Sequence, residues 1–452
     1  MGATETVSDW IVNTSYEDIP PDAIRVAGES CFDLLGVTLA GAVQPVGEII
    51  KKYVVEQGGA PQATVVVSGL RTSMPNAALA NGTMGHALDY DDFGGFGHPT
   101  VAIFPSLMAL GEKTGASGRD LLEAYVIGCE VGIALDKGTK YQQMARGFHS
   151  TAVLGRMASA AACAKLLRFD EGQTSTALGI AGSMAGGLIH NFGTMTKPLH
   201  AGLTARDGVM AAQLAGMGLT SGRQVLEHPV GFANTVLGEG TYDLEEIARA
   251  LGDPFHTQSD LMIKKYPACG GNHGMLDSIL GLMREHRFDY KDVESLDVDQ
   301  SFLSVVMLYR EPEDELKGKF SVLYNAASAL VDGEVGIDTF TPEKIRDPRI
   351  RETMAKVNLN VRSRWDEGSS EVKGATPVRV RLKDGRVLEH ATPRKEILGH
   401  QSNPWGMEGI TNKFRASARL ALSDEGVERA IETWSDVARV EDVGEAVKTL
   451  VA

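Results

Sequence analysis

The hydrophobic pattern of the chain changes its period near residue 255, and this change is the strongest constraint on the fold. Before that point, apolar residues recur at helical spacing in one segment after another. Beyond it, short segments alternate apolar and polar residues, as strands with one buried face do. The chain has 452 residues, whereas a single hydrophobic core rarely serves more than about 250–300. Two structural regions are therefore expected.

The first region is predicted to be a tightly packed helical array. Many of its segments are rich in Ala, Gly, Ser and Met, and small side chains allow helix backbones to approach closely. One short β-like run, residues 63–68, interrupts the array. Helices are predicted at residues 21–43, 73–89, 105–114, 119–135, 151–167, 174–188 and 204–218.

The second region is predicted to contain a β-sheet. Residues 293–301 and 356–363 alternate apolar and polar side chains, and residues 377–389 form two such runs joined by Asp384-Gly385, a preferred hairpin turn. The pattern is helical again from about residue 412. The expected architecture is mainly α: a large all-helical domain, residues 1–255 and 396–452, with a smaller inserted α+β lid domain, residues 256–395.

The composition excludes several classes of function. The chain carries 44 Lys+Arg against 59 Asp+Glu, a net charge of −15, whereas nucleic acids and anionic membranes select basic surfaces. No apolar run approaches the ~20 residues of a transmembrane helix, and the N-terminal segment lacks the pattern of a secretory signal. Four cysteines without a C-x-x-C pair favour a reducing compartment, so a cytoplasmic protein is expected.

The common cofactor motifs are absent from the sequence. It contains no G-x-G-x-x-G, no P-loop, no H-E-x-x-H and no G-x-S-x-G. Its four scattered cysteines give no recognisable iron–sulfur motif. We therefore expect chemistry by side chains alone, with no cofactor and no metal.

The densest group of ionisable residues is NGTMGHALDYDDFGGFGHP, residues 81–99. If its first part is helical, His86, Asp89 and Asp92 lie near one another at i, i+3 spacing. The glycines that follow indicate a loop that presents His98 before a proline. Three carboxylates and two imidazoles within 13 residues favour a functional site, because such groups tune one another's pKa. The alternative is a capped helix end with a surface histidine.

Two further groups stand at predicted helix starts. His149 precedes Ser150 and Thr151, so it lies at a helix N-terminus, where the dipole favours a neutral imidazole or a bound anion. Lys197 precedes Pro198, which suits the first turn of a helix. A cation there opposes the dipole at a cost of a few tenths of a kcal/mol, unless an anion offsets it. The alternatives are a capped, partly exposed histidine and a surface lysine.

A fourth group, KKYPACGGNH, places two lysines, Cys269 and His273 around a Gly-Gly turn. A cysteine followed four residues later by a histidine is weak as a metal motif, and a cysteine nucleophile activated by nearby charge is one reading. A helix-capping turn with a buried cysteine is the other. Tyr324, taken alone, is typical of a core tyrosine.

Together these segments resemble the MmgE/PrpD family, which includes 2-methylcitrate dehydratases, cis-aconitate decarboxylases and iminodisuccinate epimerases. The resemblance implies a large helical domain, a smaller α+β lid domain, a homodimer, no organic cofactor and an active site between the domains. The matching segments occur in family order between about residues 20 and 340: NGTMGHALDYDD…HPT, RGFHSTAVLG, NFGTMTKPLHAGLTARDGV, KKYPACGGNHGMLDS and KFSVLYNAASALVDGEV.

The resemblance also implies which residues form the site. Two positions depart from the family pattern: Phe93 stands where dehydratases and decarboxylases carry Thr, and Cys269 stands where animal decarboxylase-like members carry His. The residues expected to be catalytic are Asp89, His98, His149, Lys197, Lys264 and Tyr324, and those expected to bind substrate are Asp92, Phe93, His200, Lys265, Cys269 and His273.

The family's reactions share a carbanion beside a carboxylate, which an enzyme must stabilise with cations. Lys197, Lys264 and His98 are expected to do so, with His149 and the Asp89–His98 pair moving protons. We expect a 2-methylcitrate dehydratase-like lyase acting on a small hydroxy di- or tricarboxylate. A cis-aconitate-type decarboxylase or an iminodisuccinate-type epimerase in the same site is the alternative, and a non-catalytic helical binding protein is the remote one. The expected partner is a small anionic carboxylate, with no nucleic acid and no membrane.

Overall fold

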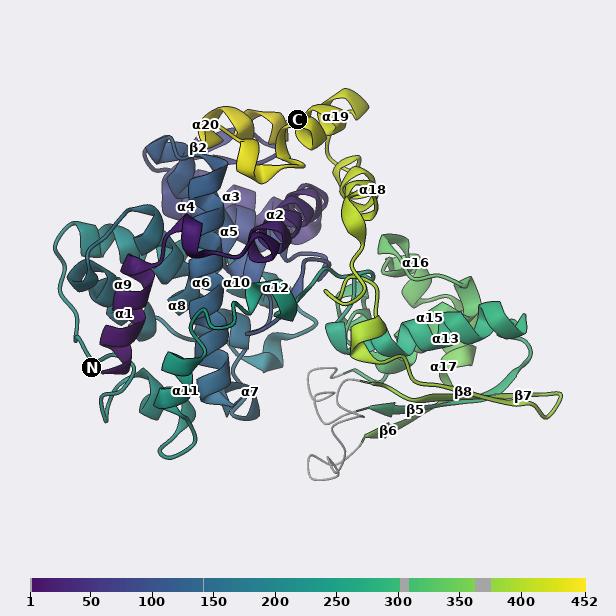
Figure 1. The fold of residues 1–452 in the computed structure, drawn as a ribbon. Helices are drawn as coiled ribbons and strands as arrows, with labels where there is room; N and C mark the ends of the chain where they lie inside the picture. Colours follow the sequence, from purple (N-terminus) through teal and green to yellow (C-terminus); the bar gives the residue numbers. More distant parts are fainter. Residues whose placement is uncertain (1, 141, 301–308, 362–374) are drawn as a thin grey trace.

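A computed structural model describes residues 2–140, 142–300, 309–361 and 375–452, and it shows a mainly α-helical protein with two lobes (Figure 1). The larger lobe, here called the helical lobe, contains the helices of the first 260 residues and the last three helices of the chain. The smaller α+β lobe contains one four-stranded sheet and five helices among the described residues. The predicted mainly α fold with a small sheet-containing part is confirmed.

The helical lobe is built around α6, which crosses its middle (Figure 1). Its helices are α1 (Ala3–Asn13), α2 (Pro21–Ala42), α3 (Pro45–Gln57), α4 (Met74–Gly85), α5 (Pro99–Thr114), α6 (Gly118–Thr139), α7 (Gln142–Ala145), α8 (Ser150–Leu166), α9 (Glu171–Ser183), α10 (Thr196–Gly216), α11 (Leu244–Arg249), α12 (Thr257–Asp260), α18 (Gly406–Ala418), α19 (Asp424–Trp434) and α20 (Val443–Ala446). Two short strands, β1 (Ala63–Val65) and β2 (Leu70–Thr72), pair in the region where the β-like run was predicted.

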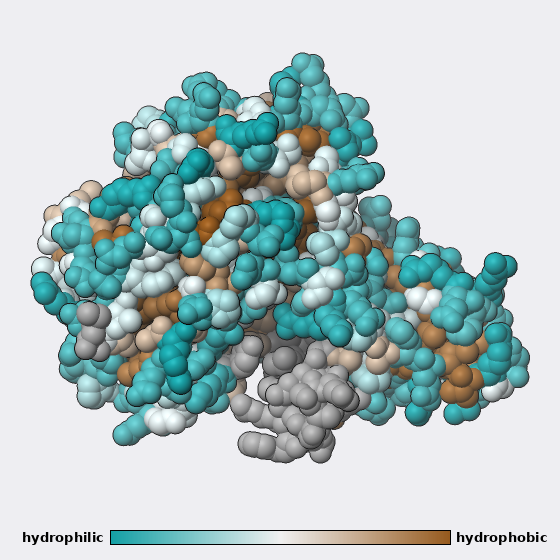
Figure 2. Space-filling view, in the orientation of Figure 1, coloured by the Kyte–Doolittle hydropathy of each residue, from teal (hydrophilic) through white to brown (hydrophobic). Residues whose placement is uncertain are grey.

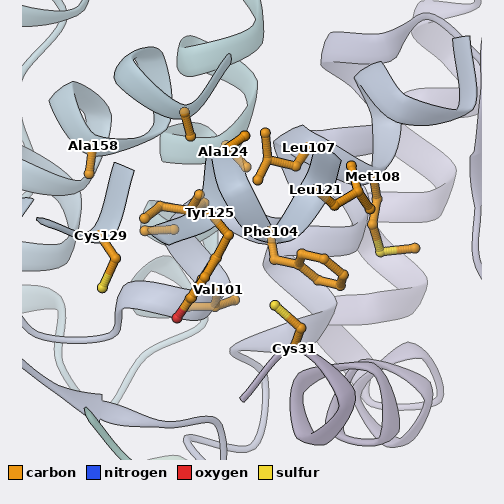
Figure 3. Packing of buried hydrophobic residues seen from close by; sticks show 14 of the residues in the cluster. Cys31, Val101, Phe104, Leu107, Met108, Leu121, Ala124, Tyr125, Cys129 and Ala158 are labelled. Carbon is orange, nitrogen blue, oxygen red and sulfur yellow. The ribbon is translucent and has the colours of Figure 1, made fainter. Parts of the chain in front are cut away.

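Small residues bring the central helices together, as the composition predicts. Gly128 of α6 faces α8, and a Cβ at this position would lie 2.6 Å from the carbonyl oxygen of Ala158. Any larger residue there would push the two backbones apart. Figure 3 shows larger side chains that fill the same core: Phe104 of α5 lies beside Cys31 of α2, and Tyr125 of α6 lies beside Val101 of α5.

The α+β lobe carries a sheet in the strand order β6-β5-β7-β8, formed by β5 (Val293–Gln300), β6 (Val357–Val361), β7 (Val378–Leu382) and β8 (Val387–His390). Strand β5 runs parallel to β6 and antiparallel to β7, and β7 and β8 form the predicted hairpin with Gly385 at a φ of 91°. The predicted strand positions 301, 362 and 363 lie outside the described residues. The helices of this lobe are α13 (His273–His286), α14 (Glu315–Gly318), α15 (Val322–Asp332), α16 (Pro342–Ile345) and α17 (Pro348–Met354).

Each lobe has its own hydrophobic core. The core of the helical lobe draws its buried residues from Val7 to Ile263 and from Ile410 to Leu450. The core of the α+β lobe draws them from Tyr266 to Leu382. It also includes Ile189 and Phe192, which come from a loop between α9 and α10 of the helical lobe. The domain boundaries at residues 255/256 and 395/396 stay a prediction.

Several predicted helix limits differ from the structure, the largest shift being that of α10, which was predicted from residue 204 and begins at Thr196. The helix predicted from residue 73 towards Asp89 ends at Gly85, and the helix predicted at residues 174–188 ends at Ser183. Helix α5 begins at Pro99, and Pro105 lies inside it rather than at its start. Because Pro99 already supplies the proline of the first turn, α5 can begin one turn and a half earlier than the sequence indicated.

None of the helices in the described ranges is both long and apolar enough to cross a membrane on its own. Helices α2 and α3 meet the length and composition criteria only as a pair bent by 85°. The face of the molecule in Figure 2 is covered mainly by hydrophilic residues.

Candidate active site

A buried cluster of ionisable side chains lies where the helical lobe meets the segment that leads into α13. Three parts of the helical lobe supply it: the loop between α4 and α5, the start of α8 and the start of α10. The fourth part is the segment of residues 263–273. The charged cluster, as named below, consists of His86, Asp89, Asp91, His98, His149, Lys197 and Lys264.

The loop after α4 turns sharply instead of continuing as a helix. His86 caps the end of α4, and the backbone N–H of Asp89 donates to the carbonyl oxygen of His86. Asp89 adopts a left-handed conformation with φ of 51°, which Asp tolerates better than most residues. The predicted helical spacing of His86, Asp89 and Asp92 is therefore wrong, because the helix ends before them. His86 and Asp89 nevertheless lie close together, with candidate ligand atoms within 4.8 Å, and His86 also contacts Asp91.

The carboxylate of Asp89 joins two lysines from different parts of the chain. Its Oδ1 lies 2.8 Å from Nζ of Lys197 and 3.0 Å from Nζ of Lys264. Lys264 also donates to the backbone carbonyl oxygen of Asp89 at 2.8 Å. Burial works to raise the pKa of Asp89, but the two ammonium groups outweigh it and hold that pKa well below its usual range. Asp89 is therefore a carboxylate at neutral pH.

Lys197 lies in the first turn of α10, as predicted, and its charge is offset by Asp89 rather than exposed to water. Burial lowers the pKa of Lys197, and the nearby carboxylate of Asp89 opposes that effect. The aromatic rings of Phe192 and Phe320 lie 5.2 and 5.3 Å from its Nζ, within the range of cation–π attraction. The two rings come from different lobes of the molecule.

Burial keeps the imidazoles of the site neutral. It lowers the pKa of His86 to about 4, against the opposing effect of Asp91, and it also lowers the pKa of His98. His149 precedes α8, as predicted, and burial holds its pKa well below the usual range. Its Nδ1 lies 3.2 Å from Nδ1 of His200, whose pKa burial lowers to about 4. The structure thus brings the predicted residues His98, His149 and His200 together.

The opposite wall of the site, here called the α+β side, combines Phe93 of the α4–α5 loop with Cys269 and His273 at the start of the α+β lobe. The ring of Phe93 lies 5.7 Å from Nζ of Lys264 and 5.5 Å from the ring of His273. Its short strand β3 (Phe93–Gly94) pairs with β4 (Leu261–Met262), which places it beside Lys264. His273 is fully buried and neither of its ring nitrogens has a hydrogen-bond partner among the described residues. Cys269 is also buried, and burial raises the pKa of its thiol.

Two predicted site residues lie elsewhere. Nζ of Lys265 is 2.7 Å from a carboxylate oxygen of Asp277, so this lysine points away from its neighbour Lys264 and from Asp89. The hydroxyl of Tyr324 donates to the carbonyl oxygen of Thr339 at 2.6 Å, inside the core of the α+β lobe. Its buried position and its partner give Tyr324 a packing role, and the structure does not bring it to the charged cluster.

Asp92 contributes its backbone rather than its carboxylate. The side chain is buried beneath the loop and accepts a hydrogen bond from the hydroxyl of Thr100 at 2.6 Å. That hydroxyl lies 2.7 Å from the hydroxyl of Tyr125. Burial raises the pKa of Asp92 to about 7. Only its carbonyl oxygen faces the cluster, where it lies 2.8 Å from Nδ1 of His98.

Several residues of the site were not assigned from the sequence. His86 and Asp91 belong to the same dense motif as Asp89, so their local pattern was the available signal. Nζ of Lys319 is buried and donates to the carbonyl oxygen of Pro267 at 3.0 Å, and burial lowers the pKa of Lys319 to about 7.

Lys413 comes from α18, and its distance from the motif along the chain leaves no signal in the sequence. Nζ of Lys413 lies 2.9 Å from a carboxylate oxygen of Asp33 and donates to the carbonyl oxygen of Tyr90, the residue after Asp89, at 2.8 Å.

Some of these side chains lie close enough together to share a metal ion. The sets are His86, His98 and His149, and His86, Asp89, Asp91 and His98, in which the candidate ligand atoms lie within 4.8 Å of one another. Nζ of Lys197, however, is already 2.6 Å from Nε2 of His86 and 2.8 Å from Asp89. Two carboxylates face two ammonium groups there, and a divalent cation would upset this balance. The absence of a metal stays a prediction.

These features define a mainly helical protein with a buried, charged site between a helical and an α+β lobe. The MmgE/PrpD N-terminal domain matches residues 5–245, and the MmgE/PrpD C-terminal domain matches residues 266–436. The chain is 31% identical to cis-aconitate decarboxylase of Homo sapiens, over 97% of this chain and 92% of that protein. It is 28% identical to the Mus musculus protein of the same name, over 97% and 91%. A cis-aconitate decarboxylase of Aspergillus terreus is 27% identical over 95% and 92%.

The chain therefore belongs to the MmgE/PrpD family, as its motifs predict, and it is an enzyme of the lyase class.

Proposed function

We propose that this enzyme generates a carbanion beside a carboxylate of a small di- or tricarboxylate, and that loss of CO2 from a cis-aconitate-like substrate is its first candidate reaction. The observation that carries the proposal is the meeting of Lys197 and Lys264 on one oxygen of Asp89, at 2.8 and 3.0 Å. Two buried ammonium groups at one point are suited to a substrate with several carboxylates. An arriving carboxylate can join Asp89 as their counterion.

The proposed chemistry follows the movement of charge. The C–C bond to the leaving carboxylate breaks, CO2 departs, and the electron pair moves through the adjacent double bond to a carbon beside a second carboxylate. The ammonium groups of Lys197 and Lys264 stabilise the charge that develops on that carboxylate. The carbon then takes one proton. We assign this proton to the ammonium of Lys197, because burial lowers its pKa and an acid with a lowered pKa releases its proton more readily.

The relatives support one order of the candidate reactions. The chain resembles proteins named cis-aconitate decarboxylase over almost its whole length, which supports decarboxylation over the dehydration that we expected first. Dehydration of a 2-methylcitrate-like hydroxy acid is the second candidate, because the same Lys197 ammonium can protonate a leaving hydroxyl. Epimerisation is the third, since it uses the same carbanion and differs in where the proton returns.

The test is incubation of the enzyme with citrate, 2-methylcitrate, cis-aconitate and iminodisuccinate, each followed by NMR in D2O. Release of CO2, loss of water or inversion of a stereocentre identifies the reaction. Deuterium uptake at a substrate carbon reveals carbanion chemistry even without net conversion. The matched control is Lys165→Met, which removes a buried lysine paired with Glu123 outside the site. If no substrate exchanges or reacts, the proposed substrate class is wrong.

Three further features are proposed from the sequence: a homodimer on the family resemblance, a cytoplasmic location on the cysteine pattern, and lobes that correspond to the domain boundaries predicted from the hydrophobic pattern. Light scattering coupled to size-exclusion chromatography would measure the mass in solution. A mass near 48 kDa, that of one chain, would contradict the dimer.

A further inference from the structure

The carboxylate of Asp91 contacts two histidines of the charged cluster at once. Its Oδ1 lies 2.8 Å from Nδ1 of His86, and its Oδ2 lies 3.2 Å from Nδ1 of His98. The side chains of His86 and Asp91 are fully buried, so water does not compete for these contacts. Burial works to raise the pKa of Asp91, but the two histidines outweigh it and hold that pKa well below its usual range. Asp91 is therefore a carboxylate that can only accept hydrogen bonds.

The acceptors around the two histidines determine their tautomers. A neutral imidazole carries hydrogen on one nitrogen and a lone pair on the other. Nδ1 of His86 faces Oδ1 of Asp91, whereas Nδ1 of His98 is hydrogen-bonded to the carbonyl oxygen of Asp92 at 2.8 Å, with Oδ2 of Asp91 beside it at 3.2 Å. Only a hydrogen on Nδ1 satisfies these contacts. Both Nε2 atoms therefore carry lone pairs.

The two lone pairs face the reacting part of the site. Nε2 of His86 lies 2.6 Å from Nζ of Lys197 and accepts one of its hydrogens, and Asp89 accepts a second at 2.8 Å. An ammonium has three hydrogens, so one remains for a substrate. Nε2 of His98 lies 3.7 Å from Oδ1 of Asp89, beyond hydrogen-bonding distance. Its lone pair is available to accept a proton.

We propose that Asp91 is a positioning residue that fixes the Nδ1–H tautomer of His86 by a hydrogen bond and favours that of His98 by its nearby charge, so that His86 aims the Lys197 ammonium and His98 presents a free base. One carboxylate would then orient both the cation and, for the dehydration or epimerisation candidates, the base that removes a proton. A third group that orients a base in this way is a recurring feature of enzymes that activate protons. The kinetic consequence rests on the proposed function, whereas the tautomers themselves do not.

The groups that face these two imidazoles come from every surrounding element. Asp89, Asp91 and Asp92 belong to the same loop, Lys197 and His200 to α10, His149 to the start of α8 and Lys264 to the segment before α13. Because these side chains come from distant parts of the chain, the pH dependence of the two histidines must be measured on the full-length protein.

The direct test is long-range ¹H–¹⁵N NMR of the full-length protein labelled at histidine, with signals assigned through His86→Gln and His98→Gln. At neutral pH, both residues should show a protonated Nδ1 and an unprotonated Nε2. In Asp91→Asn, the carboxamide can donate as well as accept, so at least one of the two should change tautomer. An Nε2–H form of either histidine in the wild type overturns the proposal. The spectrum of the wild type tests the predicted tautomers even if Asp91→Asn fails to fold or no substrate is found.

The kinetic test compares Asp91→Asn with Asp136→Asn. Asp136 is also buried, but within the described part of the chain its carboxylate accepts a hydrogen bond from Gln143 and has no histidine partner. Removal of the orienting carboxylate from a catalytic triad costs about 10⁴-fold in kcat. We expect Asp91→Asn to lose about 10²–10⁴-fold in kcat with KM changed less than about threefold, and to shift the acidic limb of the pH–rate profile. Asp136→Asn should stay within about threefold of the wild type. Unchanged tautomers or unchanged kcat in Asp91→Asn would refute the positioning role.

Discussion

The two sides of the active site differ in how their polar groups are satisfied. On the helical side, Asp91, His86 and Lys197 form a continuous chain of contacts no longer than 2.8 Å, and the buried atoms left without a hydrogen bond among the described residues are single carboxylate oxygens, Oδ2 of Asp89 and of Asp91, whose other oxygens are bonded. On the α+β side, His273 is equally buried, but both of its ring nitrogens lack a partner among the described residues, and so does Oδ1 of Asn272. A buried polar group without a partner costs about 1–3 kcal/mol.

This difference indicates a division of work. The helical side holds its charges in fixed positions before any ligand arrives, which is what stabilisation of a developing charge requires. The α+β side keeps unused hydrogen-bonding capacity beside Lys264 and Phe93, which is what recognition of a substrate requires. Substitutions on the two sides should therefore affect different kinetic constants.

Lys197→Ala should cause the largest loss, because it removes the cation at the centre of the helical side. We expect turnover to be abolished, with a fall of at least about 10³-fold in kcat/KM and the fold retained by circular dichroism. Lys165→Met is the control, since this lysine is buried in an ion pair with Glu123 and lies outside the charged cluster. Near-normal kcat/KM in Lys197→Ala would make Lys197 a structural residue and would misplace the proposed anion site.

Phe93→Thr should change substrate choice on the α+β side. The ring of Phe93 replaces a hydroxyl of the family pattern and lies close to Lys264 and His273. A missing polar partner costs about 1–3 kcal/mol, or roughly 5- to 150-fold in selectivity. We expect kcat/KM on 2-methylcitrate or cis-aconitate to rise at least severalfold. Phe93→Leu separates the two causes, because it reduces the bulk without adding a hydroxyl. If neither substrate gains in Phe93→Thr, the ring packs between the lobes and does not select the substrate.

The two sides should also respond to pH in opposite directions. Burial lowers the pKa of His273 to about 3 in the folded protein. As pH falls below about 6.5, the unfolded chain therefore takes up a proton that the folded protein does not, and the wild type loses stability. Burial raises the pKa of Asp92 to about 7, so the folded protein keeps a proton there that the unfolded chain releases. The stability that this proton gives the folded protein is lost as pH rises from about 4 to about 7. Each effect amounts to roughly 1–2 kcal/mol between pH 5.5 and 7.5.

Urea unfolding of two variants isolates these effects from those of the other buried groups. Relative to the wild type, His273→Phe should become more stable as pH falls from 7.5 to 5.5, and Asp92→Asn should become more stable as pH rises over the same range. Differences that do not depend on pH would show that these two groups keep their ordinary pKa values in the folded protein.

Treatment with EDTA should leave the activity of the enzyme unchanged, which is the smallest of the expected effects. Lys197 and Lys264 already balance the carboxylates that a divalent ion would use. Activity that disappears with the chelator and returns with an added divalent cation would overturn the predicted absence of a metal. Dialysis against buffer without EDTA is the matched control.

Much of the fold could be predicted because its signals are local. The hairpin of β7 and β8 follows from alternation and the Asp384-Gly385 turn, and the helical array follows from the spacing of apolar residues. His149 before α8 and Lys197 in the first turn of α10 were placed by the helix-start residues around them. Helix ends were less certain, because the glycine-rich end of α4 carries no strong stop signal.

The pairing within the site could be predicted only in part. Asp89 meets Lys197 and Lys264 across 108 and 175 residues, and periodicity carries no signal over such distances. The choice between Lys264 and Lys265 depends on which of two adjacent side chains faces the loop, and their residue types are identical. The family resemblance, rather than the physics of the sequence, supplied the right lysine. It also supplied Tyr324, which the structure places in a core.

The hydrogen bond from Lys413 to the loop between α4 and α5 has a consequence for biosynthesis. This lysine of α18 donates to the carbonyl oxygen of Tyr90 and pairs with Asp33 of α2, so it joins a late part of the chain to two early ones. A ribosome that has delivered only the first 400 residues has made every member of the charged cluster but not this cation. Asp33, whose pKa burial raises to about 6 despite its partner, would then lack its counterion. The nascent chain should gain its finished site only after α18 has emerged and docked.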